Sequence, residues 1–283
     1  MLLSENRFKL AVFGFNVSHG CTISTAERGI TVDWAESLRL ARRADELGLE
    51  ALIPVCRWKG FGGPSEFNHR SFETWTWAAA LAQATRRIHV FATTAVPTIH
   101  PVLAAKQGAT IDHISGGRFG LNVVAGWNRH EVAMFGLAQL PHEARYAMTD
   151  EWMSLIKALW THEGEFDFKG KFFDAPACYA EPKPVQRPRP PIMSAGVSPA
   201  GRRFAASQAD MNFILAPTLD AARETARDVR RIAREDYGRD VEVWGNAAVF
   251  CRGTRAEAQD YYRHVIEECG DYVAAGNLLD TFT

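Results

Sequence analysis

The chain has 283 residues, of which 47% are hydrophobic and 23% charged, enough to form one large hydrophobic core. Its net charge of −1 and interspersed acids and bases exclude strong attraction to nucleic acid or anionic lipid, and no apolar run is long enough for a membrane helix. Five widely spaced cysteines without a C-x-x-C pair argue against a disulfide framework or a zinc site, and no secretory signal is visible, so we expect a cytoplasmic protein.

Strand and helix patterns alternate along the chain. A helix is predicted to begin after Asp33, a natural N-cap, and to stop at Gly48. Pro101 suits the first turn of a later helix, and apolar spacing predicts a long helix over residues 141–160. The predicted strands cover residues 8–17, 49–55, 88–94, 119–124, 191–195, 211–216 and 241–251.

The pattern changes after the long helix. Residues 165–174 alternate around Lys169-Gly170, which predicts a hairpin. The proline-rich residues 181–191 can be neither a helix nor a central strand. We interpret residues from about 161 to 190 as an insertion in a single TIM-barrel domain that spans residues 1–283.

Repeated βα units with short connections predict a parallel sheet with helices outside it. The chain has no G-x-G-x-x-G after its first strand and no P-loop, which disfavours an open doubly wound sheet. We therefore predict an α/β fold, a (β/α)8 TIM barrel. Since only seven barrel strands are found, the barrel is predicted to lack its last strand and helix and to leave two open edges.

The most informative stretch is residues 110–127, TIDHISGGRFGLNVVAGW. It predicts a helix end, a Gly-Gly turn and a buried strand with Asn122 near its carboxyl end, where barrel enzymes keep their chemistry. A buried amide is costly unless it is hydrogen-bonded. Thr93 and Thr94 end the preceding strand and should lie close by. Such residues either cap strand ends or hold a small polar species such as dioxygen or its reduced forms, but they cannot act as nucleophile and base.

Two further groups of polar residues follow the fourth strand. Trp127 could wall a flat ligand while Arg129 and Glu131 position it, or the three could be an aromatic plug with solvated charges. Arg145 and Tyr146, which open the long helix, suit a phosphate or a ring edge, although such pairs commonly lie on the surface.

Two loops contain further candidate ligand-binding residues, among basic side chains and glycines. Ser198 opens a helix after a turn that contains Gly196, and such a helix start can bind an anion, although an ordinary N-cap explains Ser198 equally well. The loop at residues 56–67 combines Arg57 and Lys59 with glycines. No serine-histidine-acid arrangement and no H-x-x-x-H or H-E-x-x-H pair is visible, so a metal has weak support. This pattern favours chemistry supplied by a cofactor.

Four segments together resemble the bacterial luciferase-like flavin monooxygenases: TIDHISGGRFGLNVVAGW, FATTAVPTIHPVLAAKQ, RWKGFGGPSEF and SAGVSPAG. The resemblance runs in order from Phe8 to beyond Phe213. It is strongest to the pyrimidine monooxygenase branch, followed by the alkanesulfonate and dimethylsulfone monooxygenases.

The resemblance implies a two-component (group C) flavoprotein monooxygenase. Such an enzyme takes reduced FMN as co-substrate from a separate NAD(P)H-dependent flavin reductase. With O2 it oxidises a small organic substrate, of heteroaromatic amide or organosulfur type, through a flavin peroxide. Because exposed helices of such barrels commonly pair, we also expect a homo-oligomer, a dimer or tetramer. The charge pattern and the lack of a long apolar run leave neither nucleic acid nor a membrane as an expected partner.

The resemblance also implies roles for individual positions. Thr93 and Asn122 would be the catalytic pair that handles oxygen. Val55 and Trp127 would line the substrate pocket, and Ser198 would hold the FMN phosphate. The positions that match cofactor contacts are Cys56, Arg57, Asn122, Glu131, Arg145, Tyr146, Gly196 and Ser198. The segment Cys56-Arg57-Trp58 departs from the more aliphatic stretch of the pyrimidine enzymes, so an altered substrate wall is expected.

Two other functions remain open at this point. One is a non-catalytic flavin-binding protein, and the other is a deazaflavin-dependent oxidoreductase that transfers hydride on the same barrel without O2. The combination of Thr93 with Asn122 favours the monooxygenase.

Overall fold

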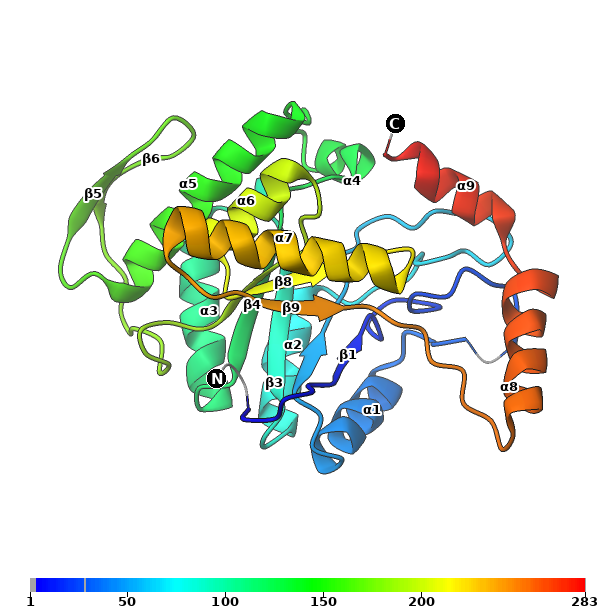
Figure 1. The fold of residues 1–283 in the computed structure, drawn as a ribbon. Helices are drawn as coiled ribbons and strands as arrows, with labels where there is room; N and C mark the ends of the chain where they lie inside the picture. The colour runs from blue at the N-terminus through cyan, green and yellow to red at the C-terminus, as the bar shows by residue number, and fades with distance from the viewer. Residues whose placement is uncertain (1–3, 28, 283) are drawn as a thin grey trace.

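The computed structural model describes residues 4–27 and 29–282, and seven of its strands form one curled parallel sheet (Figure 1). The order of the strands in this sheet is β1-β2-β3-β4-β7-β8-β9, as expected for successive βα units. The strands are β1 (Ala11–Phe13), β2 (Ala51–Ile53), β3 (His89–Ala95), β4 (Phe119–Val124), β7 (Ile192–Ser194), β8 (Met211–Ile214) and β9 (Glu242–Gly245). The predicted fold class is confirmed.

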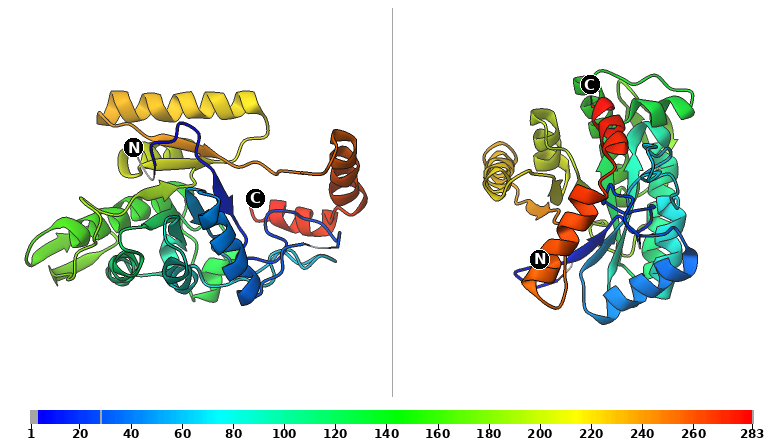
Figure 2. Two further views of the ribbon diagram at one scale, coloured as in Figure 1. Left: turned by 90° about the horizontal axis from the view of Figure 1, so that it is seen from below. Right: turned by 90° about the vertical axis from the view of Figure 1, so that its right-hand side faces the viewer.

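Helices cover the outside of the curled sheet. In Figure 2, α1 and α7 lie on opposite sides of the molecule with strands between them. The helices are α1 (Trp34–Glu46), α2 (Thr74–Ala84), α3 (Pro101–Ser115), α4 (Arg129–Met134), α5 (His142–Thr161), α6 (Pro199–Gln208), α7 (Leu219–Tyr237), α8 (Arg255–Tyr262) and α9 (Tyr272–Asp280), with a 3-10 turn at Val96–Thr98 and a π-helical turn at Arg263–Glu268. None of the helices in the described part of the chain is long and apolar enough to cross a membrane.

The predicted helix boundaries are confirmed where a capping residue sets them. Asp33 accepts a hydrogen bond from the backbone N–H of Glu36 at the start of α1, and Pro101 occupies the first turn of α3. Gly116 ends α3 with a φ of 66°, in the left-handed region that favours glycine.

Five of the seven predicted strands are longer than the observed ones, whereas β4 is confirmed over residues 119–124 and β3 is shifted by one residue at the predicted length. The first strand, predicted over residues 8–17, is only Ala11–Phe13, and the last, predicted over residues 241–251, is Glu242–Gly245. Apolar composition continues beyond the point where a strand has a backbone partner, and a strand ends where its pairing ends. The inserted hairpin is confirmed as β5 (Phe166–Lys169) paired antiparallel with β6 (Asp174–Cys178), although its second strand begins where the predicted hairpin ended.

The two faces of the sheet carry different clusters of apolar side chains. The outer face packs on helices α1, α2, α3, α5 and α6, and the inner face forms a separate buried cluster that includes Ile53, Phe91 and Phe213. Since side chains alternate along a strand, Thr93 lies on the same inner face as Phe91. Gly120 of β4 also faces inward, because a Cβ there would lie 2.4 Å from the ring of Phe91. The inner face of β3 and β4 thus ends in the polar residues Thr93 and Asn122.

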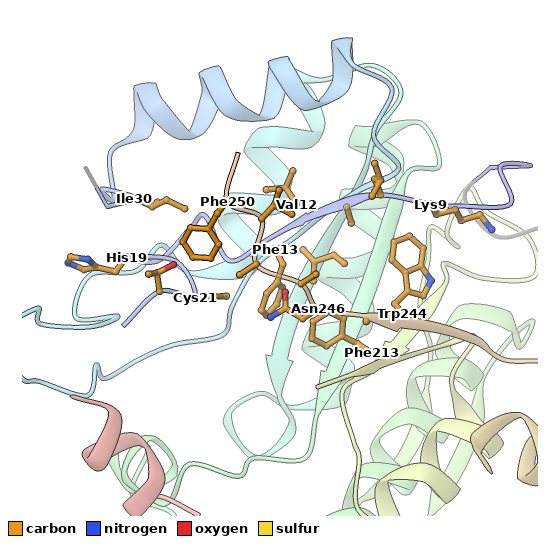
Figure 3. A pocket seen from close by; sticks show the side chains of 18 of the residues that line it. Lys9, Val12, Phe13, His19, Cys21, Ile30, Phe213, Trp244, Asn246 and Phe250 are labelled. Carbon is orange, nitrogen blue, oxygen red and sulfur yellow. The ribbon is translucent and has the colours of Figure 1, made fainter. Parts of the chain in front are cut away.

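The sheet stays open between β1 and β9, as the sequence predicted, and no eighth barrel strand is present among residues 4–27 and 29–282. A cavity of about 1170 Å³ follows this seam, lined by both edge strands and by residues 246–250. In Figure 3 the rings of Phe13 from β1 and Trp244 from β9 both lie in the space between the two edge strands. Lys9 Nζ crosses it to Glu242 Oε1 at 2.7 Å, so an ion pair joins the two edges at one end.

The C-terminal helices return to the loops at the carboxyl end of the sheet (Figure 1). The hydroxyl of Ser24 donates to the carbonyl of Val265 at 2.6 Å, and the hydroxyl of Ser65 donates to Asp271 Oδ2 at 2.6 Å. The side chain of Asn277 donates to the carbonyl of Phe61 at 2.7 Å. The segment from α8 to α9 therefore braces the loops that follow β1 and β2.

The stability of this fold is expected to depend on pH through His89. Burial and the nearby Arg118 lower the pKa of His89 from 6.5 to about 4. Between these two values the unfolded chain binds more protons than the folded chain, so stability is lost as pH falls. The free energy of unfolding should drop by roughly 1 kcal/mol per pH unit below about pH 6.5 and be unaffected by this group above it. Urea unfolding of the wild type and of His89→Gln at about pH 5 and about pH 7 checks this. The same loss in both proteins would contradict it.

Candidate active site

Thr93 and Asn122 meet at the carboxyl end of the sheet. They are register partners on the neighbouring strands β3 and β4, and only 4% and 2% of their surfaces are exposed. Asn122 Nδ2 donates to Thr93 Oγ1 at 3.1 Å, and Thr93 Oγ1 donates to the carbonyl of Pro54 at 2.5 Å. Asn122 Oδ1 is buried and has no partner. The predicted pair is thus brought together, with one polar atom left for a ligand.

The loop after β2 is held by Glu131 of α4. Glu131 Oε1 accepts from Arg57 Nη1 at 3.0 Å and from the backbone N–H groups of Trp58 and Lys59. The side chains of Arg57 and Glu131 are each only 7% exposed, so this ion pair is buried. Glu131 therefore positions the loop through Arg57, and the guanidinium keeps an unpartnered, buried Nε.

Aromatic rings form a wall beside this ion pair. Trp127 stacks on Phe61 at 6.4 Å between ring centroids and on Phe282 at 4.8 Å, both with an interplanar angle of 11°. The Arg57 guanidinium lies 4.6 Å from the centroid of Phe61 and 5.3 Å from that of Trp127. A planar cation between flat rings is favourable, and the same surface suits a planar ligand.

Along the chain, Val55 and Cys56 connect Pro54, whose carbonyl accepts from Thr93, to Arg57 of the buried ion pair. Asn16 fixes Val55 from both sides, since its Nδ2 donates to the Val55 carbonyl at 2.9 Å and its Oδ1 accepts from the Val55 N–H at 2.8 Å. Burial, followed by the negative charge of Glu131, raises the pKa of the Cys56 thiol to about 12. Cys56 is therefore an uncharged thiol at neutral pH, suited to contact a ligand but not to attack it.

The start of α6 forms a narrow cradle. Ser198 is the N-cap and accepts from the Gly201 N–H at 3.1 Å, and its hydroxyl shares a hydrogen bond with Tyr146. A Cβ on Gly196 would lie 2.7 Å from the Gly201 Cα and 2.7 Å from the Tyr146 hydroxyl. Burial raises the pKa of the Tyr146 phenol, so it remains a neutral donor. Backbone N–H groups at such a helix start suit an anion.

Helix α5 connects the loop after β4, which carries the aromatic wall, to the cradle at the start of α6. Arg145 Nη1 donates to the carbonyl of Gly126 at 3.0 Å, and the next residue, Tyr146, reaches the cradle at α6. The residues predicted for the site therefore lie at one end of the sheet, on strand ends, on loops, on the N-terminal parts of α4 and α5 and at the start of α6. Arg145 Nε, like Asn122 Oδ1 and Arg57 Nε, is buried without a partner.

Sequence reasoning missed three residues that shape this site. Asn16 clamps Val55, and its signal was a single amide directly after the first apolar run. Phe61 stacks on Trp127, and its position among the glycines of a loop gives no local signal for that contact. Phe282 reaches Trp127 from beyond the end of α9, and no local pattern predicts that contact.

These residues fit a planar ligand that carries a phosphate. The cradle of Gly196, Ser198 and Tyr146 accommodates the anion, and the aromatic wall accommodates a ring system. The unpartnered atoms of Asn122 and Arg145 provide further polar contacts. FMN has this combination of groups.

Substituting Gly196 by alanine is expected to close the cradle. Because the nearest atom to the new Cβ is the backbone Cα of Gly201, the loop must move away from the start of α6. The Kd for FMN should rise on the order of 10- to 100-fold, the cost of one or two charge-assisted hydrogen bonds. Fluorescence titration measures the change. Gly245→Ala is the control, since a Cβ there meets nothing within 4 Å. Equal losses in both variants would contradict the assignment.

Comparison with known proteins adds the family. The model of the family described as luciferase-like monooxygenase matches residues 12–280. Pyrimidine monooxygenase RutA of Bradyrhizobium sp. (strain BTAi1) is 39% identical over 230 residues, 75% of this chain and 62% of that protein. The RutA protein of Shigella flexneri is 32% identical over 281 residues, 96% of this chain and 73% of that protein. The chain spans 60%, 62% and 64% of the length of three such relatives.

A solved structure supports the fold. The crystal structure of riboflavin lyase (RcaE) with modified FMN and its substrate riboflavin superposes with a TM-score of 0.87 at 21% identity, over 99% of this chain and 70% of that one. The family match extends from β1 to the end of α9 and includes every strand that contributes to the site. The chain therefore belongs to the luciferase-like monooxygenase family.

Proposed function

We propose that this protein is an FMN-dependent monooxygenase that uses reduced FMN and O2 to oxidise a small organic substrate. The observation that carries the proposal is the buried Asn122 amide, which is bonded to Thr93 at the strand end and keeps an unpartnered oxygen. Family membership supports the same reading, because the relatives are named as monooxygenases. A separate NAD(P)H-dependent flavin reductase would supply the reduced FMN, and the protein would form a dimer or tetramer.

The residues of the site divide into three roles under this proposal. Ser198, Gly196 and Tyr146 would hold the phosphate at the start of α6. Trp127 and Val55 would line the substrate pocket. The remaining cofactor contacts would come from Cys56, Arg57, Glu131 and Arg145, with Thr93 and Asn122 as the catalytic pair.

Bound reduced flavin would supply the two electrons that O2 needs for its activation. The chain contributes binding, orientation and the exclusion of water. Thr93 and Asn122 lie on the buried inner face of the sheet, where hydrogen bonds are stronger than in water. The ion pair of Arg57 with Glu131 ties the loop after β2 to α4.

The proposed substrate is a heteroaromatic amide, with organosulfur compounds as the second choice. The relatives named pyrimidine monooxygenase favour the first class, and the flat wall of Trp127 and Phe61 suits a planar ring. Arg57 gives this wall a more polar character than an aliphatic residue would.

The test is an anaerobic titration of the protein with dithionite-reduced FMN, followed by rapid mixing with O2 and absorbance spectroscopy. Oxygen consumption is then measured with reduced FMN and uracil, and with an alkanesulfonate in a parallel assay. In the same assay run with ¹⁸O2, the expected result is a product that carries one atom of ¹⁸O. Binding of FMN without substrate-dependent oxygen use would favour a passive flavoprotein. Binding of a deazaflavin cofactor in preference to FMN, with no use of O2, would favour a hydride-transferring oxidoreductase.

A further inference from the structure

The amide of Asn212 lies inside β8, a strand whose other residues are apolar. Met211 and Phe213 belong to the inner cluster, so alternation along the strand places Asn212 on the outer face, where it is 0% exposed. It is the register partner of Ser194 on β7, beside the turn that leads to α6. A buried amide in such a strand is costly for the fold, so its contacts should account for its presence.

Asn212 donates both protons of its amide to this turn. Nδ2 donates to the carbonyl of Ser194 at 2.9 Å and to the carbonyl of Gly196 at 3.2 Å. Because a carbonyl oxygen can only accept, the Nδ2 end of the amide must face the turn. Oδ1 is buried and has no partner in the described part of the chain. The hydrogen bonds of this side chain therefore all go to one turn.

The carbonyl oxygens of the turn are already paired with donors of the protein. The amide occupies those of Ser194 and Gly196, and Arg202 Nε donates to that of Val197 at 3.0 Å. The carbonyl of Ser198 accepts from the backbone N–H of Arg202 in the first turn of α6. A phosphate is repelled by free carbonyl oxygens and attracted by N–H groups, so this pairing favours an anion at the turn.

The same contacts fix the direction of the Val197 N–H group. In a planar trans peptide the N–H points opposite to the C=O, so a Gly196 carbonyl held towards Asn212 turns the Val197 N–H away from it. This N–H has no partner among residues 4–27 and 29–282. It belongs to the residue between Gly196 and Ser198, so the turn keeps a free donor within the cradle.

We propose that Asn212 is the positioning residue of the phosphate-binding turn, and that it determines the preference of the site for FMN over a flavin without a phosphate. The inference rests on the function proposed above. Without the amide, the carbonyls of Ser194 and Gly196 lose their donor and can turn towards the bound anion. The loss should therefore affect recognition of the phosphate and spare the ring system, which would contact the loops after β2 and β4.

The experiment compares the dissociation constants of oxidised FMN and of riboflavin, which is FMN without its phosphate, by fluorescence titration of the full chain. FMN must displace riboflavin, so that both constants refer to one site. The wild type should bind FMN on the order of 100-fold more tightly, the effect of one or two charge-assisted hydrogen bonds. In Asn212→Leu, which keeps the approximate size of the side chain, this ratio should fall on the order of tenfold, through weaker binding of FMN and unchanged binding of riboflavin.

Two further variants separate this role from a general loss of stability. Gln186→Met removes an amide whose Nε2 donates to Asp112 Oδ1 and to the carbonyl of Phe119, both at 2.7 Å, at the amino end of β4. It should leave the ratio unchanged although it also loses two hydrogen bonds of an amide. Asn212→Ser keeps a single proton that can serve only one carbonyl, so the ratio should fall several-fold, and it takes the place of Asn212→Leu if that variant does not fold. Circular dichroism and thermal unfolding verify that each variant is folded.

Three results would overturn the inference. A ratio near one in the wild type would mean that the turn does not recognise the phosphate. A ratio that survives in the Asn212 variants would remove the amide as its positioning group. An equal fall in Gln186→Met would show that the ratio follows stability and not the turn. In these cases the oxygen assay above can still support the monooxygenase, whereas failure of the folded wild type to bind either flavin would overturn the proposed cofactor, and with it this inference.

Discussion

Replacing Asn122 by alanine is expected to separate the oxidation of reduced FMN from the oxidation of the substrate. Product formed per FMN oxidised should fall on the order of 100-fold while reduced FMN is still consumed and hydrogen peroxide accumulates. The reason is the loss of the one amide that joins Thr93 at the buried strand end, which leaves space for water. An assay with a flavin reductase, NADH and uracil measures the product by chromatography and the peroxide with a peroxidase.

Thr93→Ala should act in the same direction, because it removes the hydroxyl that orients Asn122. Thr93→Ser should recover most of the coupling, which a purely steric role for Thr93 would not explain. Thr94→Ala serves as the control, since its side chain lies on the other face of β3. Unchanged coupling in both Asn122→Ala and Thr93→Ala would remove this pair from the handling of oxygen.

The sequence best predicts features that depend on residues close together in the chain, such as helix boundaries. Asp33, Pro101 and Gly116 each act on backbone groups a few residues away, so their helix boundaries follow from local chemistry. The meeting of Thr93 with Asn122 also follows, because parallel neighbours in a sheet end at the same edge. Strand lengths do not follow from local chemistry, since they depend on how far a neighbouring strand continues alongside.

The rest of the site depends on contacts between distant parts of the chain. Arg57 and Glu131 are 74 residues apart in the sequence. The sequence does not show whether each side chain faces solvent, a ligand or the other. Their mutual pairing follows from the folded positions of the loop after β2 and of α4. Asn277 reaches the carbonyl of Phe61 across 216 residues, a contact that no local pattern contains. The direction of the Thr93 hydrogen bond likewise depends on where Pro54 lies.

The largest effect on stability is expected from Glu131→Gln. This change leaves the Arg57 guanidinium buried without a counter-charge, which costs about 3 kcal/mol or more in the free energy of unfolding. The glutamine oxygen can still accept from the N–H groups of Trp58 and Lys59, so the loss reports the charge and not the loop contacts. Urea unfolding of the variant and of the wild type measures the difference.

A double variant separates this structural role from cofactor binding. Arg57→Met combined with Glu131→Gln removes the buried charge together with its partner, so most of the lost stability should return, to within about 1.5 kcal/mol of the wild type. If the double variant stayed as unstable as Glu131→Gln, the unpaired guanidinium would not be the cause of the loss.

The same double variant tests whether Arg57 also contacts the flavin. Arg57 Nε is buried without a partner beside the aromatic wall, so removal of the guanidinium should weaken FMN binding on the order of tenfold even though the protein is stable. Fluorescence titration of the folded double variant measures this. An unchanged Kd would assign Arg57 to the support of its loop alone, and Arg145, with its own buried and unpartnered Nε, would then be the cation available to the flavin.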